Sequence, residues 1–402
     1  MDHETITSQF PILTQKIRGQ RLAYLDNAAT TQRPQRVLTA MDQFYRMKNA
    51  NPHRGVHYLA DAATEAFEQA RHDVAHHIGA KPQELVFTRG TTESLNQFVM
   101  SYGQRYLKAG DAVVLTEMEH HANLVPWYLL AEQKGIELRF ASLADDGSLD
   151  LKDVLQKLEG ASVFACCHVS NVLGCVNPLA KLAQMARDAD VHMIVDGAQA
   201  LGRLGVDVHE LGVDAYAFSG HKAYGPFGIG GLWVRPELLA ELPPVYGGGE
   251  MIRSVDFGQA TYADPPYRFE AGTMPVAEAV GLQAALSFIE SVGMSAIADH
   301  EQRLTAQLAA LFGEEPRVKI LGPRERVGVV SFVVDGIHPH DLATIFDQHG
   351  VAIRSGHHCA EPLHRRLGIP ASARMSLAVY NTEEDITQAH QALKSALTTF
   401  HG

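Results

Sequence analysis

The sequence has few cysteines, no long apolar run and no excess of positive charge, and each shortage excludes a class of protein. Four unevenly spaced cysteines in 402 residues are too few for a disulfide framework. No apolar run approaches the ~20 residues that a helix needs to cross a bilayer. A formal net charge of −12 argues against nucleic acid or an anionic membrane as the main partner. Since the first residues, MDHETITSQFP, show no signal peptide, we expect a cytoplasmic protein.

What is present indicates a globular α/β protein. A length of 402 residues, 46% of them hydrophobic, favours two domains. Short apolar runs alternate with helical periodicity, which predicts a mostly parallel sheet covered on both faces. The expected strands are 84–88, 112–116, 162–169, 192–196, 213–219 and 228–234, and the expected helices are 61–78, 93–107, 123–134, 179–189 and 275–291. A smaller α+β region should follow, with helices 294–312 and 383–398 and strands near 328–334 and 373–378.

Polar segments follow the expected strands at their carboxyl ends. RGTTES follows 84–88, EMEHHAN follows 112–116, and SGHKAYG follows 213–219. Ligands of open parallel sheets bind at that edge. The sequence therefore predicts a functional site there.

Asp196 and Lys222 lie one strand–helix–strand unit apart, so we expect them at the ends of neighbouring strands. Such a pair is often a structural ion pair. The glycines and proline of SGHKAYGPFG favour an irregular backbone, which suits a lysine that forms an imine. A Schiff-base lysine and a carboxylate on a pyridinium nitrogen are what pyridoxal 5'-phosphate (PLP) requires. Gly90, Thr91 and Thr92, at an expected helix N-terminus, would supply N–H groups for its phosphate.

Cys359, in VAIRSGHHCAEP, allows three interpretations. A zinc ligand would need further ligands at a recognisable spacing, which this segment lacks. An inert buried thiol suits Cys166 and Cys167, which lie inside an expected strand. For Cys359 a nucleophile fits better, because a glycine-containing turn precedes it and a possible helix follows, so the helix dipole and nearby imidazoles would favour the thiolate.

Six motifs carry a family resemblance: RGTTES, EHHANLVPW, HVSNVLG, VDGAQ, SGHKAYGP and RSGHHCA. Together they resemble the group II (SufS/CsdA-type) cysteine desulfurases of the class-V aminotransferase family, PLP-dependent enzymes of fold type I. The resemblance runs from AYLDNAATTQ near the start to SLAVYNT near the end. It implies a large PLP-binding domain, residues 15–285, with a mostly parallel seven-stranded sheet. A small α+β domain of residues 1–14 and 286–402 should carry the catalytic cysteine.

The resemblance also implies a role for each matching residue. Lys222, His120 and Cys359 should be catalytic. The residues expected to hold PLP are Lys222, Asp196, Gln199, His120, Thr91, Thr92, Ser219, His221 and, across a homodimer interface, the partner subunit's Thr273. The residues expected to bind the substrate are Asn171, Arg374, Arg354 and His53. His53 also fits a surface role, and GTMP around Thr273 departs from the GTP common in the family.

The implied reaction converts L-cysteine to L-alanine and leaves the sulfur on Cys359 as a persulfide. A small sulfur-acceptor protein would then collect it, for Fe–S cluster assembly or another sulfur route. No metal is expected. Two alternatives stay open: a selenocysteine lyase or another class-V PLP enzyme such as an aminotransferase, and a binding protein that keeps the fold without PLP.

Overall fold

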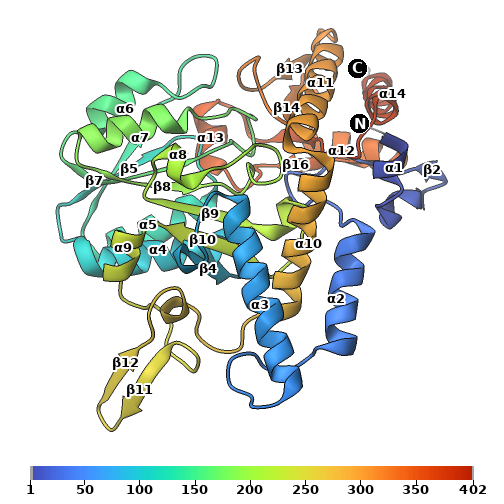
Figure 1. The fold of residues 1–402 in the computed structure, drawn as a ribbon. Coiled ribbons are helices and arrows are strands. Elements are labelled where there is room, and N and C mark those ends of the chain that lie inside the picture. Colours follow the sequence, from blue (N-terminus) through green and yellow to red (C-terminus); the bar gives the residue numbers. More distant parts are fainter. Residues whose placement is uncertain (1–2, 401–402) are drawn as a thin grey trace.

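The computed structural model describes residues 3–400 and builds them around a seven-stranded sheet (Figure 1). The strand order is β4-β10-β9-β8-β7-β5-β6, and β10 alone runs antiparallel to its neighbours in this sheet. Its strands are β4 (Leu85–Thr88), β5 (Ala112–Thr116), β6 (Glu137–Ala141), β7 (Ala161–Cys167), β8 (His192–Asp196), β9 (Ala215–Ser219) and β10 (Gly230–Val234).

Both faces of the sheet are buried because side chains alternate along each strand. In β8, for example, Met193 and Val195 pack into one core cluster and Ile194 into the other. The helices of the first face are α3 (Tyr58–His77), α6 (Leu151–Leu158), α7 (Leu179–Asp188), α8 (Val208–Leu211) and α10 (Val276–Val292). Those of the second face are α4 (Thr91–Tyr106), α5 (Val125–Lys134) and α9 (Pro236–Glu241).

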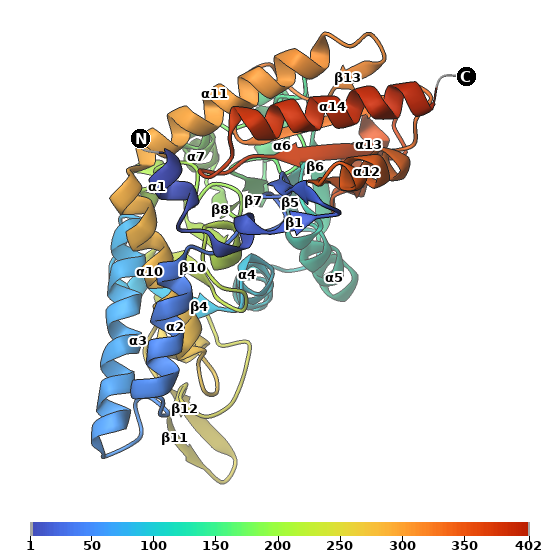
Figure 2. The same ribbon diagram turned by 90° about the vertical axis from the view of Figure 1, so that its right-hand side faces the viewer.

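A third core cluster lies in the C-terminal part of the chain. A four-stranded sheet of order β13-β14-β17-β16 packs there against three helices, two of which, α11 and α14, lie side by side in Figure 2. The elements are α11 (Met294–Gly313), β13 (Val318–Ile320), β14 (Val329–Val334), α12 (Pro339–Gln348), β15 (Val351–Ala352), β16 (Arg354–Gly356), α13 (Glu361–Arg366), β17 (Ser372–Ser376) and α14 (Glu383–Thr399).

The N-terminal segment joins the large and small cores. Phe10 packs in the first cluster, whereas Leu25 packs in the third, and β3 pairs in parallel with β15. The domain boundaries at residues 14/15 and 285/286 therefore stay a prediction. The elements are α1 (His3–Thr7), β1 (Lys16–Ile17), β2 (Gln20–Arg21), β3 (Ala23–Tyr24) and α2 (Gln35–Met47). A hairpin of β11 (Ile252–Asp256) and β12 (Gln259–Tyr262) projects from the body (Figure 1).

All six strands expected in the first part of the chain are present, and the mostly parallel seven-stranded sheet is confirmed. The alternation did not reveal that β10 is antiparallel; a short connection whose only helical element is the 3-10 turn Gly220–Lys222 joins it to β9, and parallel strands need a longer crossover. The pattern also missed β6, because this edge strand carries the exposed Glu137 and the half-buried Arg139 instead of an apolar run. Helices α2, α6 and α12 were not predicted either.

Among residues 3–400 no single helix is long and apolar enough to cross a membrane. Helices α10 and α11 pass that test only as a pair, and they meet at a bend of 78°.

Candidate active site

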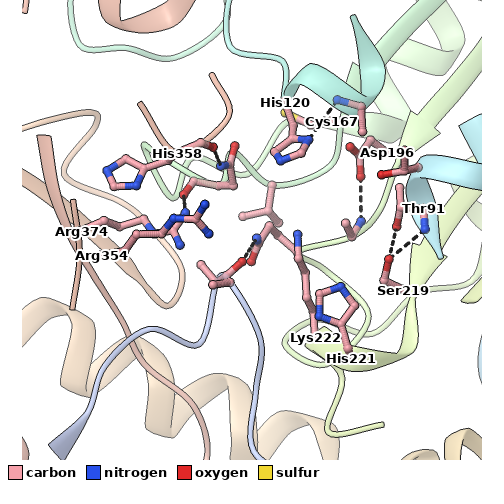
Figure 3. Close-up of a pocket in the computed structure, with 18 residues that line it drawn as sticks. Thr91, His120, Cys167, Asp196, Ser219, His221, Lys222, Arg354, His358 and Arg374 are labelled. Carbon is pink, nitrogen blue, oxygen red and sulfur yellow. Dashed lines mark hydrogen bonds between the residues drawn. The ribbon is translucent and has the colours of Figure 1, made fainter. Parts of the chain in front are cut away.

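Two parallel neighbours, β8 and β9, bring Asp196 and Lys222 to one edge of the sheet, as the sequence predicted. Asp196 is the last residue of β8, and Lys222 ends the short 3-10 turn Gly220–Lys222 that follows β9. Both side chains line a cavity of about 200 Å³ (Figure 3). The other residues that line it are Ala28, Ala29, Thr91, Thr92, His120, Ala122, Cys167, Val169, Asn171, Ala198, Gln199, Ser219, His221, Arg354, His358 and Arg374.

Burial shifts the pKa values of this pair in opposite directions. It lowers the pKa of Lys222 to about 8, although the nearby Asp196 carboxylate acts in the other direction. It raises the pKa of Asp196, and the charge of Lys222 opposes that rise. No described residue forms a hydrogen bond or an ion pair with the amine of Lys222. The structure thus places a weakly basic amine, with no bonding partner, beside a buried carboxylate.

A hydrogen bond to the backbone decides which side-chain atoms of His120 and Gln199 donate and which accept. His120 Nδ1 accepts the N–H of Ala122 at 3.0 Å, so Nε2 carries the proton of the neutral ring. Burial and the charge of Lys222 lower the pKa of His120 to about 3, which keeps the ring neutral. Gln199 donates Nε2 to the carbonyl of Ala28 at 2.8 Å, while its Oε1 is buried without a partner.

An anion site lies where α4 begins. Ser219 Oγ accepts the N–H of Thr91 at 2.8 Å and lies 2.7 Å from Thr91 Oγ1. Gly90 precedes the helix with φ 145°, and a Cβ there would lie 3.1 Å from Ser219 Oγ, so glycine leaves this corner open. His221 lines the same cavity with a buried Nδ1 that has no partner. These donors at a helix N-terminus are suited to a phosphate group.

The residues present fit PLP. Gln199 Oε1 is an orphaned buried acceptor that could accept the ring hydroxyl, and one oxygen of Asp196 accepts only the N–H of Ala198 at 2.9 Å. The second Asp196 oxygen is thus available to a protonated ring nitrogen. Lys222 would hold the aldehyde carbon, and Thr91, Ser219 and His221 the phosphate. Whether each residue has this role stays a prediction.

Two arginines lie side by side at the other end of the cavity (Figure 3). Arg354 and Arg374 are opposite partners on β16 and β17. Arg374 donates to the carbonyl of Asn171 at 3.0 Å and to Asp26 at 3.1 Å, whereas Arg354 makes no hydrogen bond or ion pair with any described residue. Burial lowers the pKa of Arg374 to about 10, so it stays charged at neutral pH. Two adjacent guanidinium groups, of which only that of Arg374 pairs with a carboxylate, leave charge for an anionic ligand.

Cys359 lies at the edge of this cavity and not in its lining. Its backbone carbonyl accepts the N–H of His121 at 2.7 Å, which ties it to the loop that carries His120. Its side chain is half-buried, and its charge acts on the pKa of Lys222. The structure therefore brings the three expected catalytic residues close together: Lys222 and His120 line the cavity, and Cys359 follows the lining residue His358.

Two expected site residues lie elsewhere in this chain. Thr273 lines two other cavities, one of them shared with His53. His53 has φ 67°, and its Nε2 lies 3.4 Å from a carboxylate oxygen of Glu68. The role of Thr273 requires a partner subunit, and both roles stay predictions. Among residues 3–400 no cluster of metal-binding side chains occurs, so no observation favours zinc.

Sequence reasoning missed Asp26 and His358. Asp26 pairs with Arg374, and its only signal was the segment LDNAATT, to which we assigned no role. His358 lines the cavity, although only Cys359 of the HHC segment was assigned. Cys166 and Cys167 are buried in β7, as predicted, and burial raises the pKa of both thiols. Cys167 nevertheless reaches the cavity wall.

Comparison with known proteins shows to which family the chain is similar. The aminotransferase class-V family model matches residues 23–388. A cysteine desulfurase of Serratia proteamaculans is 44% identical over 95% of each chain. The apo structure of a cysteine desulfurase from Thermococcus onnurineus NA1 has a TM-score of 0.94 at 40% identity and covers 98% of both chains. Escherichia coli cysteine desulfurase CsdA, in an S-sulfonic acid form, has a TM-score of 0.92 at 34% identity and covers 100% of this chain and 99% of its own.

One further solved structure bears on the cofactor. It is a mutant of C-DES with glycine covalently linked to its PLP cofactor, with a TM-score of 0.83 at 25% identity. The alignment covers 97% of this chain and 98% of that one.

Proposed function

The chain belongs to the class-V aminotransferase family, and on this premise we propose that it is a PLP-dependent cysteine desulfurase. The single observation that carries the proposal is the cavity that holds Lys222 and Asp196, with a pair of arginines in its wall and Cys359 at its edge. It turns L-cysteine into L-alanine and retains the sulfur on Cys359. When bound, PLP supplies an electron-withdrawing ring that stabilises negative charge at the substrate Cα.

The substrate is bound by its carboxylate. Arg354 has no competing partner among the described residues, and Arg374 is oriented by Asp26 and the carbonyl of Asn171. Together they direct the Cα–H bond toward Lys222. Asp196 and Gln199 would hold the cofactor ring, so the substrate would be confined between the ring and the arginines.

Lys222 moves the proton. Its pKa of about 8 leaves a useful fraction of neutral amine near neutral pH, so Nζ can take the proton from Cα and later return one. His120, held neutral by burial, packs beside Lys222 without adding positive charge. The Asp196 carboxylate would hold a protonated ring nitrogen of the cofactor.

Cys359 accepts the sulfur. Its thiolate attacks the substrate sulfur, the carbon–sulfur bond breaks, and a sulfur–sulfur bond forms on Cys359. The electron pair of the broken carbon–sulfur bond stays on the carbon of the product. The product then gains protons and leaves as alanine. The reaction thus leaves a persulfide on Cys359, and an acceptor thiol must remove its outer sulfur.

Three further features belong to the same proposal. We infer a homodimer, in which the partner subunit's Thr273 reaches the phosphate, and a small sulfur-acceptor protein as the second substrate. The setting is the cytoplasm. The exposed Phe227 and Tyr246, which share a cavity with Thr273, are consistent with a contact surface there.

The test compares the parent with Cys359→Ala. After L-cysteine, mass spectrometry of the parent should show one added sulfur on the peptide that contains Cys359, and the variant should produce alanine at least about 10²-fold more slowly. Both proteins should keep the yellow colour of bound PLP. Undiminished sulfide release by the variant would contradict the persulfide route. Faster turnover of L-selenocysteine than of L-cysteine by that variant would instead favour a selenocysteine lyase.

A further inference from the structure

The backbone at Cys359 is in an unfavourable conformation. His358 has φ 53° and Cys359 has φ 56°, so two consecutive residues with side chains occupy the left-handed region. Each such residue costs of the order of a factor of ten in population relative to an extended or helical backbone, and a pair persists only where neighbouring contacts enforce it. Neighbouring contacts therefore hold this pair of residues in place.

Hydrogen bonds of backbone groups hold the segment around Cys359. The carbonyl of Cys359 accepts the N–H of His121 at 2.7 Å, and His121 Nε2 accepts the N–H of Glu361 at 3.1 Å. The carbonyl of His358 accepts Nδ2 of Asn171 at 2.7 Å. These bonds fix the peptide groups of the segment but leave the His358 ring to be placed by other residues.

A buried chain of hydrogen bonds places that ring. His358 Nε2 lies 3.1 Å from both the carbonyl oxygen and Oγ of Ser372. Ser372 Oγ lies 2.9 Å from His364 Nε2, and His364 Nδ1 lies 3.0 Å from the carbonyl of Ala360. All three side chains are at most 3% exposed. This chain of hydrogen bonds thus begins at His358, one residue before Cys359, and ends at Ala360, one residue after it.

The direction of each bond follows from the two carbonyl oxygens, which can only accept. His358 must carry its proton on Nε2, and His364 must carry its proton on Nδ1. Neutral His364 then offers a bare Nε2, which accepts the hydroxyl proton of Ser372. Burial lowers the pKa of His358 to about 2, and it also lowers the pKa of His364, which favours the neutral ring that the bond to the Ala360 carbonyl leaves with a bare Nε2. Each proton of this hydrogen-bond chain is therefore assigned to one atom.

We propose that the side chains of His364 and Ser372 are positioning groups for Cys359: they orient the ring of His358, whose tautomer the backbone carbonyl of Ser372 sets. The hydroxyl of Ser372 can support His358 only while His364 accepts its proton. If His364 lost its acceptor nitrogen, the hydroxyl would turn toward another acceptor and the left-handed pair would relax. Cys359 would then lose the orientation that lets its sulfur approach a ligand in the cavity.

This inference rests on the proposed function for the role of Cys359, but its test does not need turnover. The holoenzyme and its variants are treated with iodoacetamide, and the alkylation rate of Cys359 is measured by mass spectrometry. His364→Leu removes the acceptor, whereas His364→Gln can present Oε1 to the hydroxyl of Ser372. His300→Leu is the matched control, because His300 also bonds a backbone carbonyl, that of Asn381 at 2.9 Å, away from the cavity.

In His364→Leu, the loss of one hydrogen bond should raise the alkylation rate about fivefold and lower kcat for L-cysteine by a similar factor. The KM for L-cysteine should stay within about twofold, because Arg374 keeps its bonds to Asn171 and Asp26. His364→Gln and His300→Leu should behave like the parent. Ser372→Ala, which introduces no larger side chain, should reproduce His364→Leu.

An alkylation rate unchanged in both His364→Leu and Ser372→Ala would overturn the proposal. Equal effects of His364→Leu and His364→Gln would also overturn it, since only one of them lacks an acceptor. A parent enzyme that alkylates at Cys359 but never forms a persulfide would refute the proposed function and leave this comparison of rates valid.

Discussion

The two walls of the active site are built on opposite principles. The wall that carries Lys222 leaves polar atoms without partners: the amine of Lys222, Oε1 of Gln199 and Nδ1 of His221. On the wall that carries Cys359, the carbonyls of His358 and Cys359 and the ring nitrogens of His364 all have partners within the chain. Some side-chain atoms on that wall do lack partners among the described residues: His358 Nδ1, which its tautomer leaves bare, Nε of Arg374, and the guanidinium of Arg354.

This difference shows which wall needs a ligand. A buried polar atom without a partner costs about 1–3 kcal/mol, so the Lys222 wall is more stable when a cofactor supplies the missing bonds. The backbone groups around Cys359 already have their bonds, which keep two left-handed residues in place without a ligand. We therefore expect the first wall to respond strongly to PLP and the second to respond little.

The largest expected effect is at Lys222. Lys222→Ala should lower kcat for L-cysteine by at least about 10³-fold, because no other amine in the cavity can move the Cα proton. Lys181→Ala, an exposed lysine on α7, is the control and should keep full activity. Steady-state alanine formation measures both. Substantial activity in Lys222→Ala would place the base elsewhere and remove the contrast between the walls.

The pH dependence of PLP uptake should show an intermediate effect. Burial lowers the pKa of Lys222 to about 8, so the neutral amine that attacks the aldehyde becomes scarcer as the pH falls below that value. The rate at which apo protein gains covalent PLP should fall about tenfold per pH unit below about 8 and level off above it. Stopped-flow absorbance of the yellow product measures the rate. A profile that still rises steeply at the pKa of an ordinary lysine would contradict this assignment.

The smallest expected effect is the change in hydrogen exchange that PLP binding causes on the Cys359 wall. The experiment uses PLP at about 1,000 times its Kd, which should stabilise the folded protein by about 4 kcal/mol, since PLP binds only that state. Hydrogen exchange should slow markedly in segments 90–92, 196–199 and 219–222. Amides of 354–376 should change by less than about twofold, because their bonds are internal. Comparable protection of both segments would show that the Cys359 wall also depends on the cofactor.

The strand pattern and the site chemistry were readable from the sequence because both are local. Buried strands such as β5 and β8 are continuous apolar runs, and the turn after β9 has its glycines and lysine in one short segment. Their parallel pairing then requires Asp196 and Lys222 to meet. An edge strand such as β6 gave no signal, because its exposed side has no apolar requirement.

The sequence by itself determined which reactive side chains the protein has and at which strand ends they stand. Only the tertiary structure decided that Asp26 pairs with Arg374, that Arg354 faces it without a partner, and that Ser372 and His364 support the segment at Cys359. The physical reason is distance along the chain: Asp26 and Arg374 are 348 residues apart, and no periodicity relates them. Their meeting depends on how β3, β15, β16 and β17 pack, which the fold as a whole sets.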